Sequence, residues 1–398
     1  MLSLLQLSFA IILFLVAQLT WARAFTHILW ELSIGILEGG YFAVLPCLML
    51  AWWSFKTRPF GHASAVLYLL TALLFALPLF QAVQTASRLE RSFERGFGKT
   101  VPAETFHRTQ PLIWKDLWVG IHFPKVEPLQ KVYAVYTEET GDSSKELSLD
   151  FYPAASQNTE STNASVHSEK APCVIVIHGG GWNSDDRKEL APLNGYLSSL
   201  GYAVASIDYR LSPRYTYPAP VMDVQNALRF LRKHAEEWNL DTTRFILLGR
   251  SAGGQIALQA AYTLKDPGIK GVIAFYAPAD MVFGYSLPGN PLLLDSRKLM
   301  EDYLRGSYSQ NPAAYHNSSP VESVDSSSPP TLLLQGHRDV LVSFQHTVHL
   351  EKKLSALGVD HFTVDLPWAT HGYDFVFSGP GSQISLYFME RFLAKVAQ

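Results

Sequence analysis

The chain has 398 residues, enough for one large domain and an additional module. Its formal net charge is −3 at pH 7, and no long run of Lys or Arg occurs, so we do not expect a nucleic-acid partner. Only two cysteines are present, Cys47 in an apolar stretch and Cys173 at the start of an expected strand. A disulfide framework is therefore not expected to hold this protein together.

The N-terminal part of the chain is far more apolar than the rest. Residues 2–21 and 64–83 are almost entirely apolar, and each is about as long as a membrane-spanning helix. Residues 33–53 form a weaker third stretch, interrupted by Glu38, which we expect to face a neighbouring helix; a proton-relay or substrate-binding role is the alternative. We therefore predict an all-α transmembrane module of two or three spans in residues 1–86.

Basic residues in short flanking segments set the orientation of such a module. With three spans, the side that carries the C-terminal domain has five of them, namely Arg23, Arg88, Arg91, Arg95 and Lys99, and the other side has Lys56 and Arg58. The count predicts a multi-pass membrane protein whose C-terminal domain is cytoplasmic.

The chain from residue 131 onward has the pattern of an α/β domain, after a mixed connector at 87–130. Short runs at 132–136 and 147–152 alternate apolar and polar residues, as in antiparallel strands at a sheet edge. Strands and helices then alternate, which is typical of a mostly parallel sheet covered on both faces. The expected strands are 174–177, 202–207, 245–248, 271–275, 331–335 and 361–366, and the expected helices are 188–200, 222–238, one after Gly253, 344–357 and 382–396.

This alternation predicts a catalytic domain at 131–398. Residues 280–329 break the rhythm, and their length is typical of a cap inserted over a site.

Residues 249–253 read Gly-Arg-Ser-Ala-Gly and lie between an expected strand and an expected helix. A sharp turn in this position exposes the hydroxyl of Ser251, and the flanking glycines remove side chains that would clash there. Ser251 is therefore the predicted nucleophile.

Residues 178–182, His-Gly-Gly-Gly-Trp, follow the strand expected at 174–177. Consecutive glycines allow main-chain N–H groups to turn toward a substrate oxygen, which is how an oxyanion hole is built. We predict the N–H groups of Gly180, Gly181 and Ala252 as its donors; a flexible turn is the alternative for the glycines.

An acid and then a histidine follow the nucleophile in folds with this turn. Asp339 comes just after the strand at 331–335 and His371 just after the strand at 361–366, so both fall at the edge where parallel strands end. We predict His371 as the base and Asp339 as the acid that orients it.

The other histidines fit these roles less well. His337 is expected to be a loop residue. His346 and His349 are spaced like metal ligands on a helix, but no third ligand accompanies them, so we expect them on the helix surface and predict no metal site.

These motifs resemble those of the hormone-sensitive-lipase and feruloyl-esterase-like (BD-FAE-like) carboxylesterase branches of the α/β-hydrolase superfamily. The matching segments, in order, are HGGGW at 178–182, DYRLSP at 208–213, GRSAGG at 249–254, GHRD at 336–339 and HGY at 371–373. The resemblance covers about residues 131–398 and no part of the membrane module.

The resemblance implies an α/β-hydrolase fold and an acyl-enzyme mechanism on carboxylic esters, without a metal or organic cofactor. It also implies a structural role for Asp223. Arg250 departs from the pattern, because lipases of this group often carry Asp before the nucleophile. We expect a salt bridge for Arg250, with an effect on substrate charge as the alternative.

The sequence thus predicts a membrane-anchored serine hydrolase that acts on a small ester, with lipophilic esters among the candidates. An amidase or formamidase on the same triad is one alternative, and a catalytically silent binding protein with this fold is another. The lipid bilayer is the expected partner of the N-terminal helices, and no oligomeric state is predicted.

Overall fold

The computed structural model describes residues 2–57, 59–97, 106–137, 144–155, 170–287 and 289–398. In this part of the chain one eight-stranded sheet has the order β1-β2-β4-β3-β5-β6-β7-β8. The first two strands are antiparallel and lie at one edge, and the strands from β4 to β8 are parallel, so the predicted fold class is confirmed. The strands are Leu129–Thr137 (β1), Ser144–Tyr152 (β2), Ala171–Ile177 (β3), Ala203–Ile207 (β4), Leu240–Arg250 (β5), Ile269–Phe275 (β6), Thr331–Gly336 (β7) and His361–Leu366 (β8).

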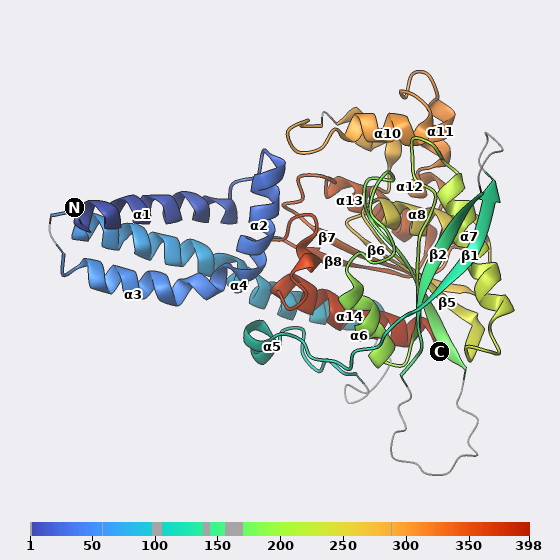
Figure 1. Ribbon diagram of the computed structural model, residues 1–398, viewed down its shortest axis with the longest axis horizontal. Coiled ribbons are helices and arrows are strands. Elements are labelled where there is room, and N and C mark those ends of the chain that lie inside the picture. The colour runs from blue at the N-terminus through green and yellow to red at the C-terminus, as the bar shows by residue number, and fades with distance from the viewer. Residues whose placement is uncertain (1, 58, 98–105, 138–143, 156–169, 288) are drawn as a thin grey trace, which may run out of the picture.

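The central strands are buried because helices cover both faces of the sheet (Figure 1). One face packs against α7 (Ala219–Lys233), α8 (Ala252–Thr263) and α13 (Gln345–Leu357). The other packs against α6 (Ala191–Ser199) and α14 (Pro380–Val396).

The predicted element boundaries differ from the observed ones mainly around α7 and β5. The helix expected to reach residue 238 ends at Lys233, and a turn at 234–239 follows it. The strand after it begins at Leu240 instead of 245, since Leu240 still pairs with Ala171 of β3.

The segment that we expected to form a cap carries short helices in its described residues. They are α9 (Met281–Ser286), α10 (Ser296–Leu304), α11 (Pro312–Asn317) and α12 (Pro320–Ser323). Figure 1 shows α10 and α11 on the outside of the sheet domain, with the loop before α10 reaching toward the N-terminal helices.

The N-terminal region contains three helical stretches that are long and apolar enough to cross a membrane: Ser3–Thr20, His27–Ser54 and Gly61–Phe93. The first is α1 (Leu2–Ala17) with the short turn Gln18–Thr20, and the last belongs to α4 (Gly61–Phe97). Helices α1 and α3 (Val44–Ser54) pack along the first half of α4 as a bundle (Figure 1).

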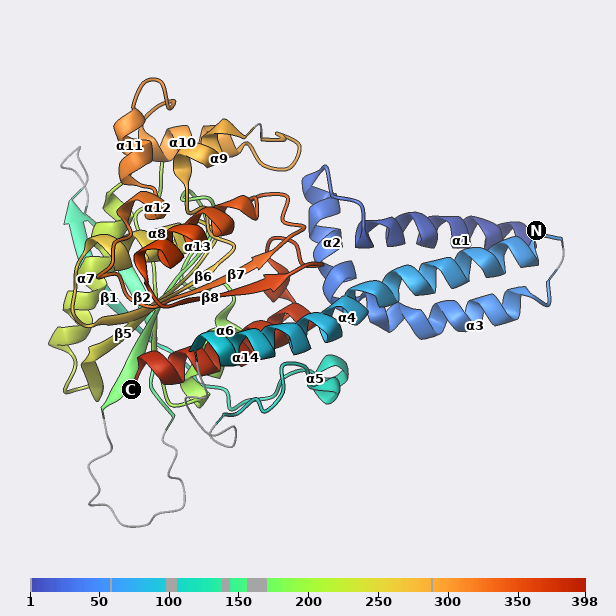
Figure 2. The same cartoon turned by 180° about the vertical axis from the view of Figure 1, so that it is seen from behind.

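The middle stretch is bent, because Gly39 and Gly40 separate α2 (His27–Gly39) from the short turn Gly40–Ala43 that leads into α3. Helix α2 lies across the end of the bundle and against the sheet domain (Figures 1 and 2). The third span expected at 33–53 therefore has only its second half aligned with the bundle.

Helix α4 runs without a break from the bundle onto the sheet domain, past residue 86 (Figure 2). Its second half packs beside β8 and α14, where the ring of Phe93 meets that of Phe362 edge to face at 4.9 Å. The expected connector contains α5 (Trp114–Val119), which accepts a hydrogen bond from the Tyr41 hydroxyl at its Leu117 carbonyl, 2.8 Å away. The N-terminal helices are thus packed onto the sheet domain.

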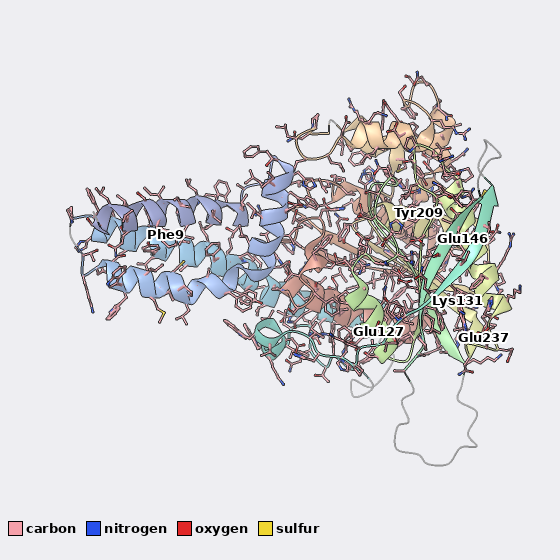
Figure 3. All side chains as sticks on the ribbon, viewed as in Figure 1. Phe9, Glu127, Lys131, Glu146, Tyr209 and Glu237 are labelled. Carbon is pink, nitrogen blue, oxygen red and sulfur yellow. The ribbon has the colours of Figure 1, made fainter. Side chains whose placement is uncertain are left out.

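The N-terminal bundle and the sheet domain also differ in their content of charged side chains. The sequences of α1 and α3 contain no Asp, Glu, Lys or Arg, and Phe9 of α1 lies in the bundle (Figure 3). Lys131, Glu146 and Glu237 lie at the opposite end of the molecule (Figure 3). This asymmetry is expected when one end of a protein contacts lipid and the other contacts water.

Candidate active site

Ser251 occupies a strained turn between β5 and α8. Its backbone has φ 50° and ψ −120°, a conformation that L-residues rarely adopt. The turn is tight enough to require glycine on both sides: a Cβ on Gly249 would lie 2.1 Å from the Gly253 carbonyl oxygen, and one on Gly253 would lie 2.1 Å from the His178 carbonyl oxygen. The local sequence therefore holds the Ser251 hydroxyl at the carboxyl edge of the sheet.

The structure brings Ser251, His371 and Asp339 together although they lie on three different loops. His371 Nε2 is 3.0 Å from Ser251 Oγ, and His371 Nδ1 is 2.7 Å from Asp339 Oδ2. These distances are within hydrogen-bonding range for a nucleophile, a base and an orienting acid.

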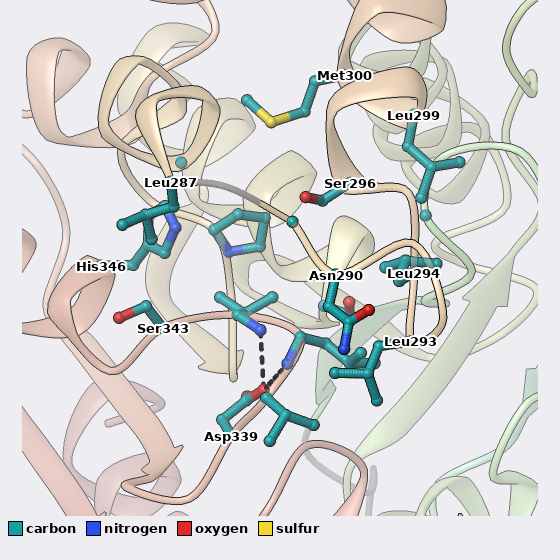
Figure 4. A pocket seen from close by; sticks show the side chains of 18 of the residues that line it. Leu287, Asn290, Leu293, Leu294, Ser296, Leu299, Met300, Asp339, Ser343 and His346 are labelled. Atoms are coloured by element: carbon teal, nitrogen blue, oxygen red, sulfur yellow. Dashed lines mark hydrogen bonds between the residues drawn. The ribbon is translucent and has the colours of Figure 1, made fainter. Parts of the chain in front are cut away.

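The Asp339 carboxylate is buried and surrounded by donors. Its Oδ1 accepts hydrogen bonds from the main-chain N–H groups of Leu341 and Val342 at 2.9 and 2.8 Å, and its Oδ2 accepts one from the Gln335 side chain at 2.9 Å. Figure 4 shows Asp339 at one side of the cavity with two of these bonds dashed. Such donors stabilise an ionised carboxylate without solvent.

His371 is held by contacts from outside the sheet as well. The Trp30 indole of α2 donates a hydrogen bond to the His371 main-chain carbonyl at 3.0 Å, and the Tyr276 ring lies 4.3 Å from the imidazole, centroid to centroid. A helix of the N-terminal region thus contacts the loop that carries the predicted base.

The glycine loop adopts backbone conformations that favour glycine. Gly180 and Gly181 have φ of 88° and 57°, and within the described residues their N–H groups donate to no protein acceptor. Ala252 is the first residue of α8, so its N–H lacks an intrahelical acceptor. Gly179 anchors the loop, since its N–H donates to the Glu189 carboxylate at 2.6 Å.

A cavity of about 670 Å³ opens over Ser251. Long aliphatic side chains of the cap line much of it (Figure 4), namely Leu287, Leu293, Leu294, Leu299 and Met300. Arg23 and Ala24, which connect α1 to α2, also line it. No local sequence pattern links Arg23 or Ala24 to residues more than two hundred positions away, so neither was predicted at the site, and Arg23 entered only the count of basic residues that sets the orientation.

Comparison with known proteins supports the same architecture. Residues 162–354 match the family model described as BD-FAE. The probable carboxylic ester hydrolase LipM of Mycobacterium tuberculosis is 28% identical over 57% of this chain and 54% of its own length. The esterase LipQ of the same organism is 28% identical over 52% of this chain and 51% of its own. The chain thus spans about half the length of these curated relatives.

Among solved structures, a bacterial heroin esterase superposes with a TM-score of 0.56 at 22% identity, covering 70% of this chain and 86% of that one. The chain therefore has the α/β-hydrolase fold, and we call its sheet domain the hydrolase domain. In this hydrolase domain, β1 to β8 and the helices on both faces form the core, and Ser251, Asp339 and His371 follow β5, β7 and β8.

Arg250 of the hydrolase domain forms the salt bridge that we expected. It is buried, and its Nε donates to Asp374 Oδ2 at 2.6 Å. Asp374 also accepts a hydrogen bond from the Tyr276 hydroxyl at 2.5 Å. The guanidinium is not among the groups that line the cavity, so it has no direct route to a substrate charge.

Asp223 pairs with Arg210 of the hydrolase domain, accepting hydrogen bonds from its main-chain N–H and its Nε at 2.9 and 3.0 Å, respectively. This agrees with the structural role that the family resemblance implies.

The prediction for the pair His346 and His349 was wrong for His346, which is buried and lines the cavity. The α13 face that carries it turns toward the cap, and its Nδ1 accepts a hydrogen bond from the Asp280 N–H at 3.2 Å. Burial lowers the pKa of His346 to about 4, so it is neutral near pH 7.

His349 pairs with the Asp280 carboxylate at 2.9 Å, and His337 pairs with Asp365. The described residues contain no group of three or more His, Cys, Asp or Glu that could hold a metal ion.

Proposed function

We propose that this protein hydrolyses carboxylic esters through an acyl-enzyme intermediate. The observation that carries the proposal is the continuous hydrogen-bonded series Ser251, His371, Asp339, of which Ser251 and Asp339 line a cavity that Gly181 and Ala252 also line. The curated relatives named as ester hydrolases support an ester over an amide substrate.

In the proposed reaction, His371 Nε2 takes the proton of Ser251 as its oxygen attacks the ester carbonyl carbon. The Gly180, Gly181 and Ala252 N–H groups stabilise the negative oxygen that forms. His371 then gives its proton to the departing alcohol, and the acyl group remains on Ser251. A water molecule, deprotonated by His371, attacks the acyl carbon; His371 then gives that proton to Ser251 Oγ as the acyl–oxygen bond breaks and the acid leaves. Asp339 keeps the imidazole in the required tautomer throughout.

The test is the substitution Ser251→Ala, with Ser343→Ala as a matched control that also lies on the cavity wall. We expect Ser251→Ala to abolish hydrolysis of p-nitrophenyl butyrate and labelling by a fluorophosphonate probe, without a change in thermal unfolding, while the control retains both. An active Ser251→Ala protein would refute the nucleophile assignment. A parallel assay with an anilide and a formamide distinguishes the esterase from the amidase alternative.

We further propose that α1, α3 and α4 anchor the protein in a bilayer, with the hydrolase domain on the cytoplasmic side. Support comes from the three apolar stretches and from the position of Arg23 at the end of the bundle that faces the hydrolase domain. Full-length protein should stay in the membrane fraction after a carbonate wash, and release into the supernatant would contradict the anchor. Protease added to sealed vesicles of known orientation tests the sidedness.

A further inference from the structure

The carboxyl edge of the sheet, where the proposed active site lies, faces the transmembrane bundle. Arg338, the neighbour of Asp339, donates hydrogen bonds to the main-chain carbonyls of Thr20 and Ala22 at the end of α1. Trp30 of α2 holds the His371 loop. The cavity over Ser251, which Arg23 and Ala24 also line, therefore lies beside the end of the helices that enter the membrane.

The wall of the cavity on this side is made jointly by the cap and the segment that leaves the bundle. The His27 N–H donates to the Leu292 carbonyl, and the Asn290 side chain donates to the Phe25 carbonyl, both at 2.9 Å. These bonds join the loop before α10 to the start of α2.

Large apolar side chains lie on the outer surface of this junction, beside the exposed ion pair of His27 and Glu31 on α2, and we call these apolar side chains the apolar rim. Each is more than half exposed, and together they are Trp21, Phe25, Ile28, Leu32 and Leu292. The opposite side of α2 is buried against the hydrolase domain through Leu37 and Glu38. Exposed apolar side chains of this size are unfavourable in water, and α1 and α3 carry exposed large apolar side chains as well.

The interior of the cavity suits the same kind of molecule. Its volume lies within the range of about 300–1,000 Å³ that is usual for small-molecule sites, and its cap side is aliphatic. Arg23 is exposed at this wall and has no acidic partner among the described residues, so it can face the phosphates of a headgroup layer.

From this arrangement we propose that the apolar rim sits in the leaflet next to the hydrolase domain and that the substrate is an acyl ester lipid resident in that leaflet. The lipid passes the rim into the cavity without crossing water, and its ester carbonyl meets Ser251. This inference rests on the proposed ester hydrolysis and names its substrate class.

The test uses the full chain reconstituted in phosphatidylcholine vesicles. We compare turnover of 4-methylumbelliferyl palmitate in the bilayer with turnover of water-soluble p-nitrophenyl butyrate, and report the ratio of the two. In the double variant Ile28→Asp with Leu292→Asp this ratio should fall by about tenfold or more. The two charged side chains disfavour insertion of the rim into the lipid, so the cavity no longer opens next to the bilayer and the high local concentration of substrate is lost. Met222→Asp is the matched control, since Met222 is an exposed apolar residue on α7, and its ratio should equal that of the wild type.

The outcomes separate the two proposals. Wild-type protein inactive on both esters contradicts the proposed function. Wild-type protein active on butyrate, with the same ratio in the rim variant, overturns the present inference alone.

A second measurement does not depend on activity. Cys47 and Cys173 are buried, so a nitroxide can be attached at Leu292→Cys or, as control, at Met222→Cys. We expect oxygen to relax the label at 292 much more strongly than a water-soluble nickel chelate does, and we expect the chelate to relax the label at 222 strongly. Equal access of the chelate to both labels would overturn the inference.

Discussion

Replacement of Glu38 by Ala should destabilise the whole protein, although Glu38 lies in the apolar N-terminal region. Its side chain is fully buried and accepts hydrogen bonds from the Trp368 indole at 2.9 Å and from the Gly381 N–H at 2.7 Å. Trp368 precedes the loop that carries His371, and Gly381 lies in the first turn of α14. One carboxylate of α2 thus joins two segments of the hydrolase domain.

The expected magnitude follows from the two donors that Glu38→Ala leaves without an acceptor. Each buried, unsatisfied donor costs about 1–3 kcal/mol, so the loss is about 2–6 kcal/mol. Unfolding entropy is about 2.1 cal/mol/K per residue, which for 398 residues makes 1 kcal/mol equivalent to about 1.2 °C. The melting temperature should therefore fall by roughly 2–7 °C. Glu38→Gln keeps one carbonyl oxygen as acceptor and should show about half of this loss.

The assay is thermal unfolding in detergent micelles, with kcat and KM for p-nitrophenyl butyrate measured on the same samples. Because the His371 loop loses a support while the cavity keeps its lining, kcat should fall more than KM rises. If Glu38→Ala melts within a degree of the wild type, α2 is not an integral part of the hydrolase fold and the reasoning fails.

Three further predictions concern the interior of the hydrolase domain. Asp339→Asn should lower kcat by about 10⁴ with little change in KM, because the amide favours the wrong imidazole tautomer; a loss confined to KM would contradict the orienting role. Arg250→Met should cost about 3–5 kcal/mol by leaving a buried carboxylate unpaired, and adding Asp374→Asn should recover part of it. Urea unfolding of Arg250→Met and of the double variant with Asp374→Asn measures both free-energy changes, and equal stability of these two variants would disprove the pairing. His346 has a folded-state pKa of about 4, below the ordinary 6.5, because it is buried. The unfolded chain therefore binds the proton first, and stability should fall by up to about 3 kcal/mol as pH drops from 6.5 through 4. His346→Gln should flatten that part of the stability profile, and an unchanged slope would speak against a neutral buried His346.

The sequence predicted those features of the fold that leave a local pattern. Buried strands have runs of β-branched residues, amphipathic helices have a period, and a strand-turn-helix around Ser251 requires glycine at 249 and 253. The chain order of nucleophile, acid and base then left few candidates, and the structure places Ser251, Asp339 and His371 within hydrogen-bonding distance.

Contacts between distant segments were beyond local patterns. Glu38 was recognisable as an ionisable residue in an apolar stretch, but its partners lie more than 300 residues away. Trp30 and the two cavity-lining residues between α1 and α2 likewise meet segments that lie far away in the sequence. The predicted catalytic domain at 131–398 therefore lacks α2 and the second half of α4, which cover part of the hydrolase core.

The continuity of α4 has a consequence for selectivity. The helix has 37 residues and a length of about 55 Å; its first half lies in the bundle, and Leu89 and Phe93 of its second half are packed into the hydrolase core. Because α4 is one continuous helix between the two parts, it fixes the height and tilt of the hydrolase domain relative to the bundle. Ser251 would then work at one constant depth in the headgroup region. Esters at that depth would be cleaved, and esters placed higher or deeper would be spared, so the protein would discriminate among lipids by the level of the bond as well as by the shape of the molecule.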